Sequence, residues 1–181
     1  MRACILVPLG AALLAAAPAG ASVITVGGSH ATTCWRAAET RRPDADAWTA
    51  CNIALATETL SPQDRAGTFV NRGILHMLSQ RWDRAAADFA QAERIDPAQA
   101  EIYVNQAVVA YEQSDPANAR LLATKALGLG TRKPAVAHFV RGVANEDLGQ
   151  VRAAYADLSE AARLAPRWSE PKRELARYRL R

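Results

Sequence analysis

Residues 66–99 contain two amphipathic segments in succession, and this pairing most constrains what the chain can fold into. In the first, small and apolar residues at offsets 0, 1, 4, 5, 8 and 9 share one helix face: Phe69, Val70, Gly73, Ile74, Met77 and Leu78. In the second, offsets 0, 3, 4, 7 and 10 carry Trp82, Ala85, Ala86, Phe89 and Ala92. Asp96-Pro97 then ends the second segment. The stretch predicts two helices joined by a short polar turn.

The two-helix unit recurs downstream. Residue pairs related by 69 positions, about two units, are Arg72 and Arg141, Gly73 and Gly142, Ala85 and Ala154, Asp88 and Asp157, Ala92 and Ala161, Arg94 and Arg163, and Pro97 and Pro166. A step of 34 positions takes Asn71 to Asn105 and Ala85 to Ala119, which places a middle copy between the outer two. This copy has Ala107 where the others have glycine.

A period of about 34 residues, with a small residue in the first helix, alanine in the second and a closing proline, resembles the tetratricopeptide repeat (TPR). The resemblance implies an all-α fold, a right-handed α-solenoid of about three helical hairpins at 66–99, 100–134 and 135–168. The small residues let the two helices of each hairpin approach closely. One hairpin cannot bury both of its apolar faces, so the copies are expected to stack.

The resemblance also implies where a partner would bind. In this family the first helices of successive repeats line a concave groove that holds peptide segments. By register, the predicted groove residues are Val70, Ile74, Met77, Val104, Val108, Tyr111, Phe139, Val143 and Glu146. An open alternative is that part of this apolar face packs against neighbouring helices. The groove-facing positions lack the lysines of the family's carboxylate clamp, although Asn71 and Asn105 match one of its asparagine positions. An apolar or extended peptide is therefore expected.

Residues 1–21 are typical of a secretory signal peptide. Arg2 precedes an apolar run, and Ala19-Gly20-Ala21 is a small-x-small cleavage site before Ser22. The competing interpretation is a membrane anchor, but the run is short and interrupted by proline and glycine. The sequence thus predicts a bacterial-type exported protein, secreted across the inner membrane into the periplasm, with no membrane span after cleavage.

Two cysteines lie beyond the predicted signal, Cys34 and Cys51. An even number in an exported chain predicts a disulfide, with two buried free thiols as the alternative. Residues 22–60 are predicted to form a loose leader (22–33) followed by a degenerate helical hairpin that the disulfide joins. Ser61-Pro62, Asp96-Pro97 and Asp115-Pro116 are predicted helix starts.

Residues 169–181 are predicted to form a C-terminal capping helix rich in arginine and lysine. It is either a basic docking patch or, more simply, a solvated outer face. The net charge of +4 is too small and too dispersed to indicate a nucleic-acid partner.

The sequence contains no complete catalytic or metal-binding pattern. His30 and Cys34 are spaced for a metal, but two ligands make a weak site. His76 and His138 have no nucleophile at a defined offset and are predicted to be packed or surface residues. Asp83, Asp88 and Asp157 are predicted to face solvent. No enzyme activity, cofactor or metal is therefore expected.

Two functions are consistent with this pattern. The first is a non-enzymatic adaptor of the cell envelope that binds a peptide or helix of a partner protein in its groove. The second is a structural protein that self-associates into a homo-oligomer through its apolar face or its C-terminal helix.

Overall fold

The computed structural model describes residues 22–24 and 29–178. The predicted signal peptide lies outside this range, as do residues 25–28 and 179–181. Regular structure in the described residues consists of nine helices: α2 (Ser29–Glu39), α3 (Ala45–Thr57), α4 (Pro62–Leu78), α5 (Trp82–Ile95), α6 (Ala100–Glu112), α7 (Pro116–Gly128), α8 (Pro134–Asp147), α9 (Val151–Leu164) and α10 (Glu170–Leu175).

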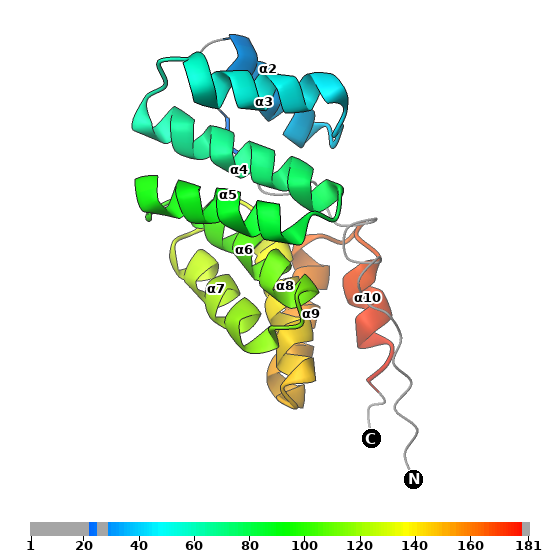
Figure 1. The fold of residues 1–181 in the computed structure, drawn as a ribbon. Helices are drawn as coiled ribbons and strands as arrows, with labels where there is room; N and C mark the ends of the chain where they lie inside the picture. The colour runs from blue at the N-terminus through cyan, green and yellow to red at the C-terminus, as the bar shows by residue number, and fades with distance from the viewer. Residues whose placement is uncertain (1–21, 25–28, 179–181) are drawn as a thin grey trace.

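Successive helices pair into hairpins, and the hairpins stack (Figure 1). The predicted repeats 66–99, 100–134 and 135–168 correspond to α4–α5, α6–α7 and α8–α9, although α4 begins one turn earlier, at Pro62. The first helices also contact one another, α2 with α4, α4 with α6, and α6 with α8. The predicted all-α solenoid of helical hairpins is thus what the described residues form.

Side-chain caps start the helices where the sequence indicated. Ser61 Oγ accepts a hydrogen bond from the Asp64 N–H (3.1 Å), and Asp115 Oδ1 accepts one from the Asn118 N–H (3.1 Å). A proline follows each cap, where its missing N–H costs nothing. These two predicted helix starts are confirmed. The third, at Asp96-Pro97, is wrong, because α6 begins at Ala100, after Gln99, and has no side-chain cap.

Close helix approach within each hairpin depends on complementary side-chain sizes. A Cβ atom added to Gly73 would lie 2.5 Å from Phe89 Cε1, and one added to Gly142 would lie 2.9 Å from Leu158 Cγ. In the middle hairpin Ala107 is fully buried, and the position equivalent to Phe89 and Leu158 is the small Ala123, also fully buried. Each copy therefore combines either glycine with a large residue or two alanines.

The N-terminal hairpin α2–α3 carries the Cys34–Cys51 disulfide, so the predicted bond is confirmed. Both cysteines are fully buried. The Glu58 carboxylate, just after α3, accepts hydrogen bonds from the His30 and Ala31 N–H groups at the start of α2. Burial acts to raise the pKa of Glu58, but these bonds outweigh it and lower the pKa below 4.5.

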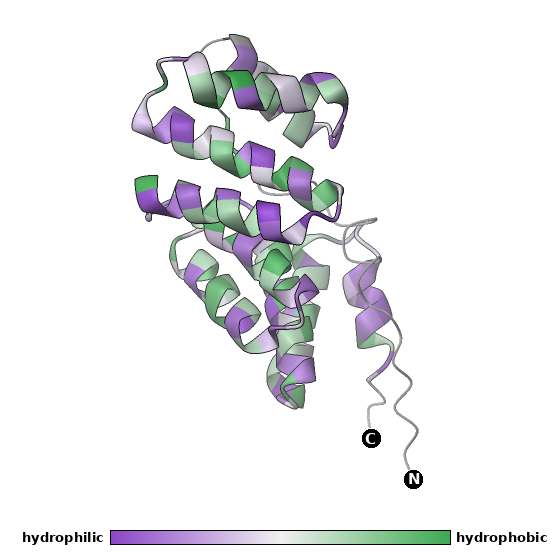
Figure 2. Cartoon of the chain, viewed as in Figure 1, coloured by the Kyte–Doolittle hydropathy of each residue, from purple (hydrophilic) through white to green (hydrophobic). Residues whose placement is uncertain are grey.

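The C-terminal helix α10 is short and packs on α9. Figure 2 shows it as predominantly hydrophilic. It covers only Glu170–Leu175 of the predicted helix 169–181, and Glu170 and Pro171 at its start are buried. None of the helices in residues 22–24 and 29–178 has the length and apolar character needed to cross a membrane.

Candidate functional site

The predicted groove residues lie on the first helices α4, α6 and α8, but most are buried. Seven of the nine, all except Tyr111 and Glu146, are at most 8% exposed. These side chains belong to the hydrophobic core. The expectation that they line an open groove in the free protein is therefore corrected, because the chain covers this face itself. Their role in binding stays a prediction.

C-terminal residues cover the part of this face on α8. Arg177 pairs with Glu146 (Nη2 to Oε1, 3.2 Å), and Trp168 packs on Phe139 with ring centroids 4.7 Å apart. Tyr111 is partly buried, and this burial together with the nearby Asp147 carboxylate raises the pKa of its hydroxyl. The last residues of the described chain thus close this end of the array.

The N-terminal residues 22–24 cover the part on α4. The Val23 N–H donates to Asn71 Oδ1 (3.0 Å), and Asn71 Nδ2 donates to the Val23 carbonyl (2.8 Å). Asn71 is fully buried, and the Val23 side chain, 8% exposed, joins the core. One side-chain amide therefore satisfies both main-chain groups of a residue 48 positions away.

A second set of contacts holds Ser22. Arg132, in the loop before α8, donates from Nη2 to the Ser22 carbonyl (3.3 Å). Glu101, 7% exposed at the start of α6, accepts from the Arg132 N–H (3.0 Å) and Nε (3.3 Å) and so orients the guanidinium. The Ser22 hydroxyl donates to the Glu39 carboxylate on α2.

The environment of residues 22–24 therefore comes from three first helices and one loop. A cavity of about 260 Å³ adjoins it, with walls that include Trp35, Glu39, Arg132 and Lys133. By contrast, Ile24 is 56% exposed. The site binds main chain and one small apolar side chain, and leaves the next side chain in solvent.

The sequence interpretation missed this site. Residues 22–33 were expected to be a loose leader, but Val23 is buried and α2 already begins at Ser29. The available signal in the sequence was Asn71, which matches an asparagine position of the repeat family. Nothing local to residues 22–24 indicated that they pair with α4.

The aspartates of the second helices are a further correction. Asp88 and Asp157 were predicted to face solvent, but they are 5% and 7% exposed. Each accepts two hydrogen bonds, of 2.9 and 2.7 Å, from an arginine on the preceding helix, Arg72 or Arg141. The pairs are related by the 69-residue step, so the repeat itself carried the signal.

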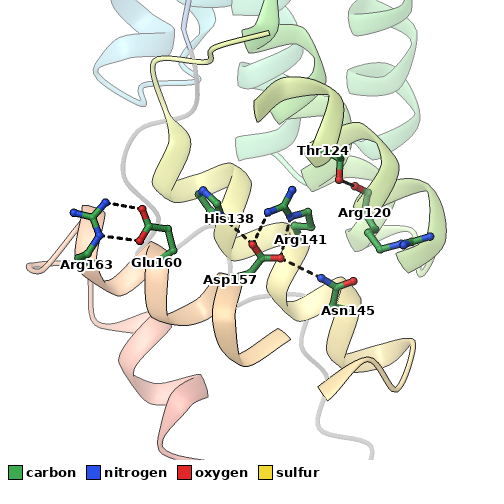
Figure 3. Close-up of polar contacts among 8 residues, drawn as sticks. All are labelled: Arg120, Thr124, His138, Arg141, Asn145, Asp157, Glu160 and Arg163. Atoms are coloured by element: carbon green, nitrogen blue, oxygen red, sulfur yellow. Dashed lines mark hydrogen bonds and ion pairs between the residues drawn. The ribbon is translucent and has the colours of Figure 1, made fainter. Parts of the chain in front are cut away.

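Figure 3 shows the second of these clusters, in which three side chains point at the Asp157 carboxylate. His138 Nδ1 lies 2.9 Å from Oδ1, and Asn145 Nδ2 donates to Oδ2 (3.1 Å). Burial acts to raise the pKa of Asp157, but the bonds from Arg141 and His138 outweigh it and hold the pKa below the usual 3.8. The cluster therefore joins α8 to α9 as an ion pair.

In the α4–α5 hairpin a histidine at a different position of the repeat makes a looser contact with the aspartate. His76 Nε2 lies 3.7 Å from Asp88 Oδ2, and its ring packs on Trp48 at 4.6 Å between centroids. Burial lowers the pKa of His76 below 6.5; Asp88 opposes this shift and nearby arginines reinforce it. His30 contacts Glu58, and Cys34 is in the disulfide, so these residues do not share a metal site.

The middle hairpin has no arginine–aspartate pair. Gln106 and Leu122 occupy the equivalent positions, and Gln106 Nε2 instead donates to Glu93 Oε2 on α5 (2.9 Å). A cavity of about 310 Å³ opens between α5, α6 and α7, with both residues in its wall. The two residues that replace the ion pair in this copy therefore line an open cavity.

A solved structure supports the fold. The Arabidopsis OM64 TPR domain matches with a TM-score of 0.61 and 25% sequence identity, over 65% of this chain and 96% of that chain. No protein-family model matches the sequence, and no curated protein matches it. The structural match confirms a solenoid of TPR-like hairpins and is consistent with a protein-interaction module.

Proposed function

We propose that this chain is a non-enzymatic adaptor of the cell envelope whose first-helix face binds an extended segment of a partner protein. The observation that carries this proposal is the pairing of Asn71 with both main-chain groups of Val23. Main-chain hydrogen bonds together with a pocket for one side chain are how extended peptides are generally recognised. The TPR-like fold supports the same conclusion.

The disulfide supports the compartment. Structural disulfides persist in oxidising compartments such as the periplasm, and Cys34 and Cys51 form one. We therefore propose secretion across the inner membrane, with cleavage after Ala21. The mass of the protein isolated from the envelope fraction should correspond to a chain that begins at Ser22 and has no free thiol. A retained N-terminus or two reactive thiols would contradict the location.

The binding proposal is tested by site-specific photocrosslinking in intact cells. A photoreactive residue in place of Lys133, in the cavity wall, should attach to a non-helical segment of a partner. The same residue in place of Leu121, 63% exposed on α7, is the matched control and should not attach to that segment.

Two variants show whether the attachment depends on main-chain recognition. Arg132→Gln and Asn71→Ala should each reduce crosslinking at position 133, with circular dichroism used to establish that the array stays folded. Attachment that is unchanged in both variants, or equal at position 121, would refute a binding site on this face. Attachment to a second copy of the chain would instead support the structural, self-associating alternative.

A further inference from the structure

Residues 22–24 have the contacts of a bound peptide although they belong to the same chain. Three consecutive main-chain groups are satisfied by side chains from elsewhere: the Ser22 carbonyl by Arg132, and the Val23 N–H and carbonyl by Asn71. None of these bonds depends on which side chains the segment carries. A different polypeptide could make all three.

The side chains define what such a polypeptide would need. The position of Val23 is enclosed in the core and takes a small apolar side chain. The position of Ser22 places a hydroxyl against Glu39, whereas the position of Ile24 is 56% exposed and imposes little selection. The preferred segment is extended, with a small polar residue followed by valine or a similar β-branched residue.

We propose that Ser22–Ile24 is a built-in competitor that occupies the peptide site of the free protein, and that a partner's extended segment of this chemistry displaces it. This inference rests on the proposed function, since it names the ligand class and the regulation of the same site. A tethered segment competes at an effective concentration on the order of millimolar. Weak or mismatched segments are thereby excluded.

The experiment compares two neighbouring substitutions in the full chain. Val23→Asp places a charge at the enclosed position and should expel the segment. Ile24→Asp alters the exposed neighbour and should leave the segment in place. Hydrogen exchange at residues 22–24 reports release directly, with fast exchange expected for Val23→Asp and slow exchange for Ile24→Asp.

Binding is then measured by fluorescence anisotropy with a peptide of residues 22–27 that keeps a free N-terminus, as in the cleaved chain, and is labelled at its C-terminus. Val23→Asp should bind it at least about tenfold more tightly than the wild type or Ile24→Asp, because the apparent dissociation constant rises as the open fraction falls. Adding Asn71→Ala to Val23→Asp should abolish binding, because the main-chain partners are lost.

If the wild type and Val23→Asp bind the peptide with equal affinity, Ser22–Ile24 does not act as a competitor, although the site still binds peptides. If the Val23→Asp variant releases its own segment and the peptide still does not bind, the assigned ligand class is wrong. The photocrosslinking experiment tests the proposed function independently of this result. If Val23→Asp does not fold, the wild type is used instead. Millimolar peptide should then accelerate exchange at Val23, and unchanged exchange would refute displacement. A wild-type dimer in which each copy's segment occupies the other copy's site would also refute displacement. Sedimentation would detect such a dimer.

Discussion

At the scale of single residues, the arginine–aspartate pairs join α4 to α5 and α8 to α9. A buried ion pair is weak evidence of net stabilisation, because desolvation of both charges offsets their attraction. Removing one partner is different, since it leaves an uncompensated charge. The middle hairpin, with Gln106 and Leu122, shows that the fold also accepts an uncharged version of this contact.

Asp88→Leu is therefore expected to destabilise the protein by about 3 kcal/mol, because Arg72 loses its partner. The double variant Arg72→Gln/Asp88→Leu reproduces the middle hairpin and should recover more than half of that loss. Urea unfolding of the two variants measures the difference. A double variant no more stable than the single one would mean that the pair is needed beyond its charge balance.

His76 is expected to make stability depend on pH below its ordinary pKa. Because burial lowers the pKa of His76, its contribution is fully present above pH 6.5 and is lost as the pH falls toward the folded pKa. Burial raises the pKa of Glu112 from 4.5 to about 7, which gives a contribution of opposite sign that decreases as the pH rises across that range. Because the contributions of His76 and Glu112 to the pH dependence of stability have opposite signs, a variant of His76 is needed to separate them.

His76→Asn is the matched variant, because Asn145 occupies the equivalent position in the third hairpin. It should reduce the loss of stability between pH 6.5 and pH 5 relative to the wild type. The loss as the pH falls through the lowered pKa of Asp157, below 3.8, should be unchanged. Identical profiles for wild type and variant across pH 5–6.5 would exclude His76 as the source.

At the scale of elements, the distance between the two helices of each repeat is set by the sizes of two facing residues that are sixteen positions apart in the sequence. Gly142 faces Leu158, and an added Cβ would also lie 3.2 Å from the Leu158 backbone nitrogen. Backbone cannot move aside as a flexible side chain can. The glycine is needed here for close approach.

Gly73→Leu and Gly142→Leu should each destabilise by about 1–3 kcal/mol or more through overpacking. A sharper test uses the alanine pair of the middle hairpin as its template. Gly73→Ala should destabilise the wild type but stabilise the Phe89→Ala variant, because the atoms nearest to the added Cβ all belong to the Phe89 ring. Thermal melts of the four proteins give the coupling, and an effect of the same sign in both backgrounds would contradict this packing.

The disulfide is expected to act mainly on the N-terminal hairpin. Cys34 and Cys51 are 17 positions apart, a loop for which chain entropy gives about 3 kcal/mol. Reduction should therefore accelerate hydrogen exchange in α2 and α3 more than in α6–α9. It should also loosen Val23, because Glu39 and Cys34 share α2. Uniform acceleration along the chain would show that the array unfolds as one unit.

At the scale of the whole molecule, the two ends of the described chain cover opposite parts of one face. Residues 22–24 lie against α4, and Trp168 and Arg177 lie against α8. A repeat array must close its ends in some way, and this one also covers its first helices. The face offered to a partner is therefore one that the chain already occupies.

Val104→Glu tests whether this face is core. Val104 is 1% exposed, so an unpaired carboxylate there should cost several kcal/mol and unfold the array. Leu121→Glu, on the exposed side of α7, should change stability by no more than about 0.5 kcal/mol. A normal melting midpoint for Val104→Glu would mean that this side chain lies in an open groove, as the repeat pattern predicted.

The sequence alone determined the helices of the three repeats and their pairing, and it predicted the disulfide from the even number of cysteines. Periodic apolar residues specify which side chains share a helix face, and the 69-residue step between Gly73 and Gly142 specifies the repeat, because both depend on spacing along the chain. Tertiary structure alone decided what covers each face. Val23 reaches Asn71 across 48 positions, and Arg177 reaches Glu146 across 31. Helical spacing carries no information about such contacts, because burial depends on which distant segments meet in space.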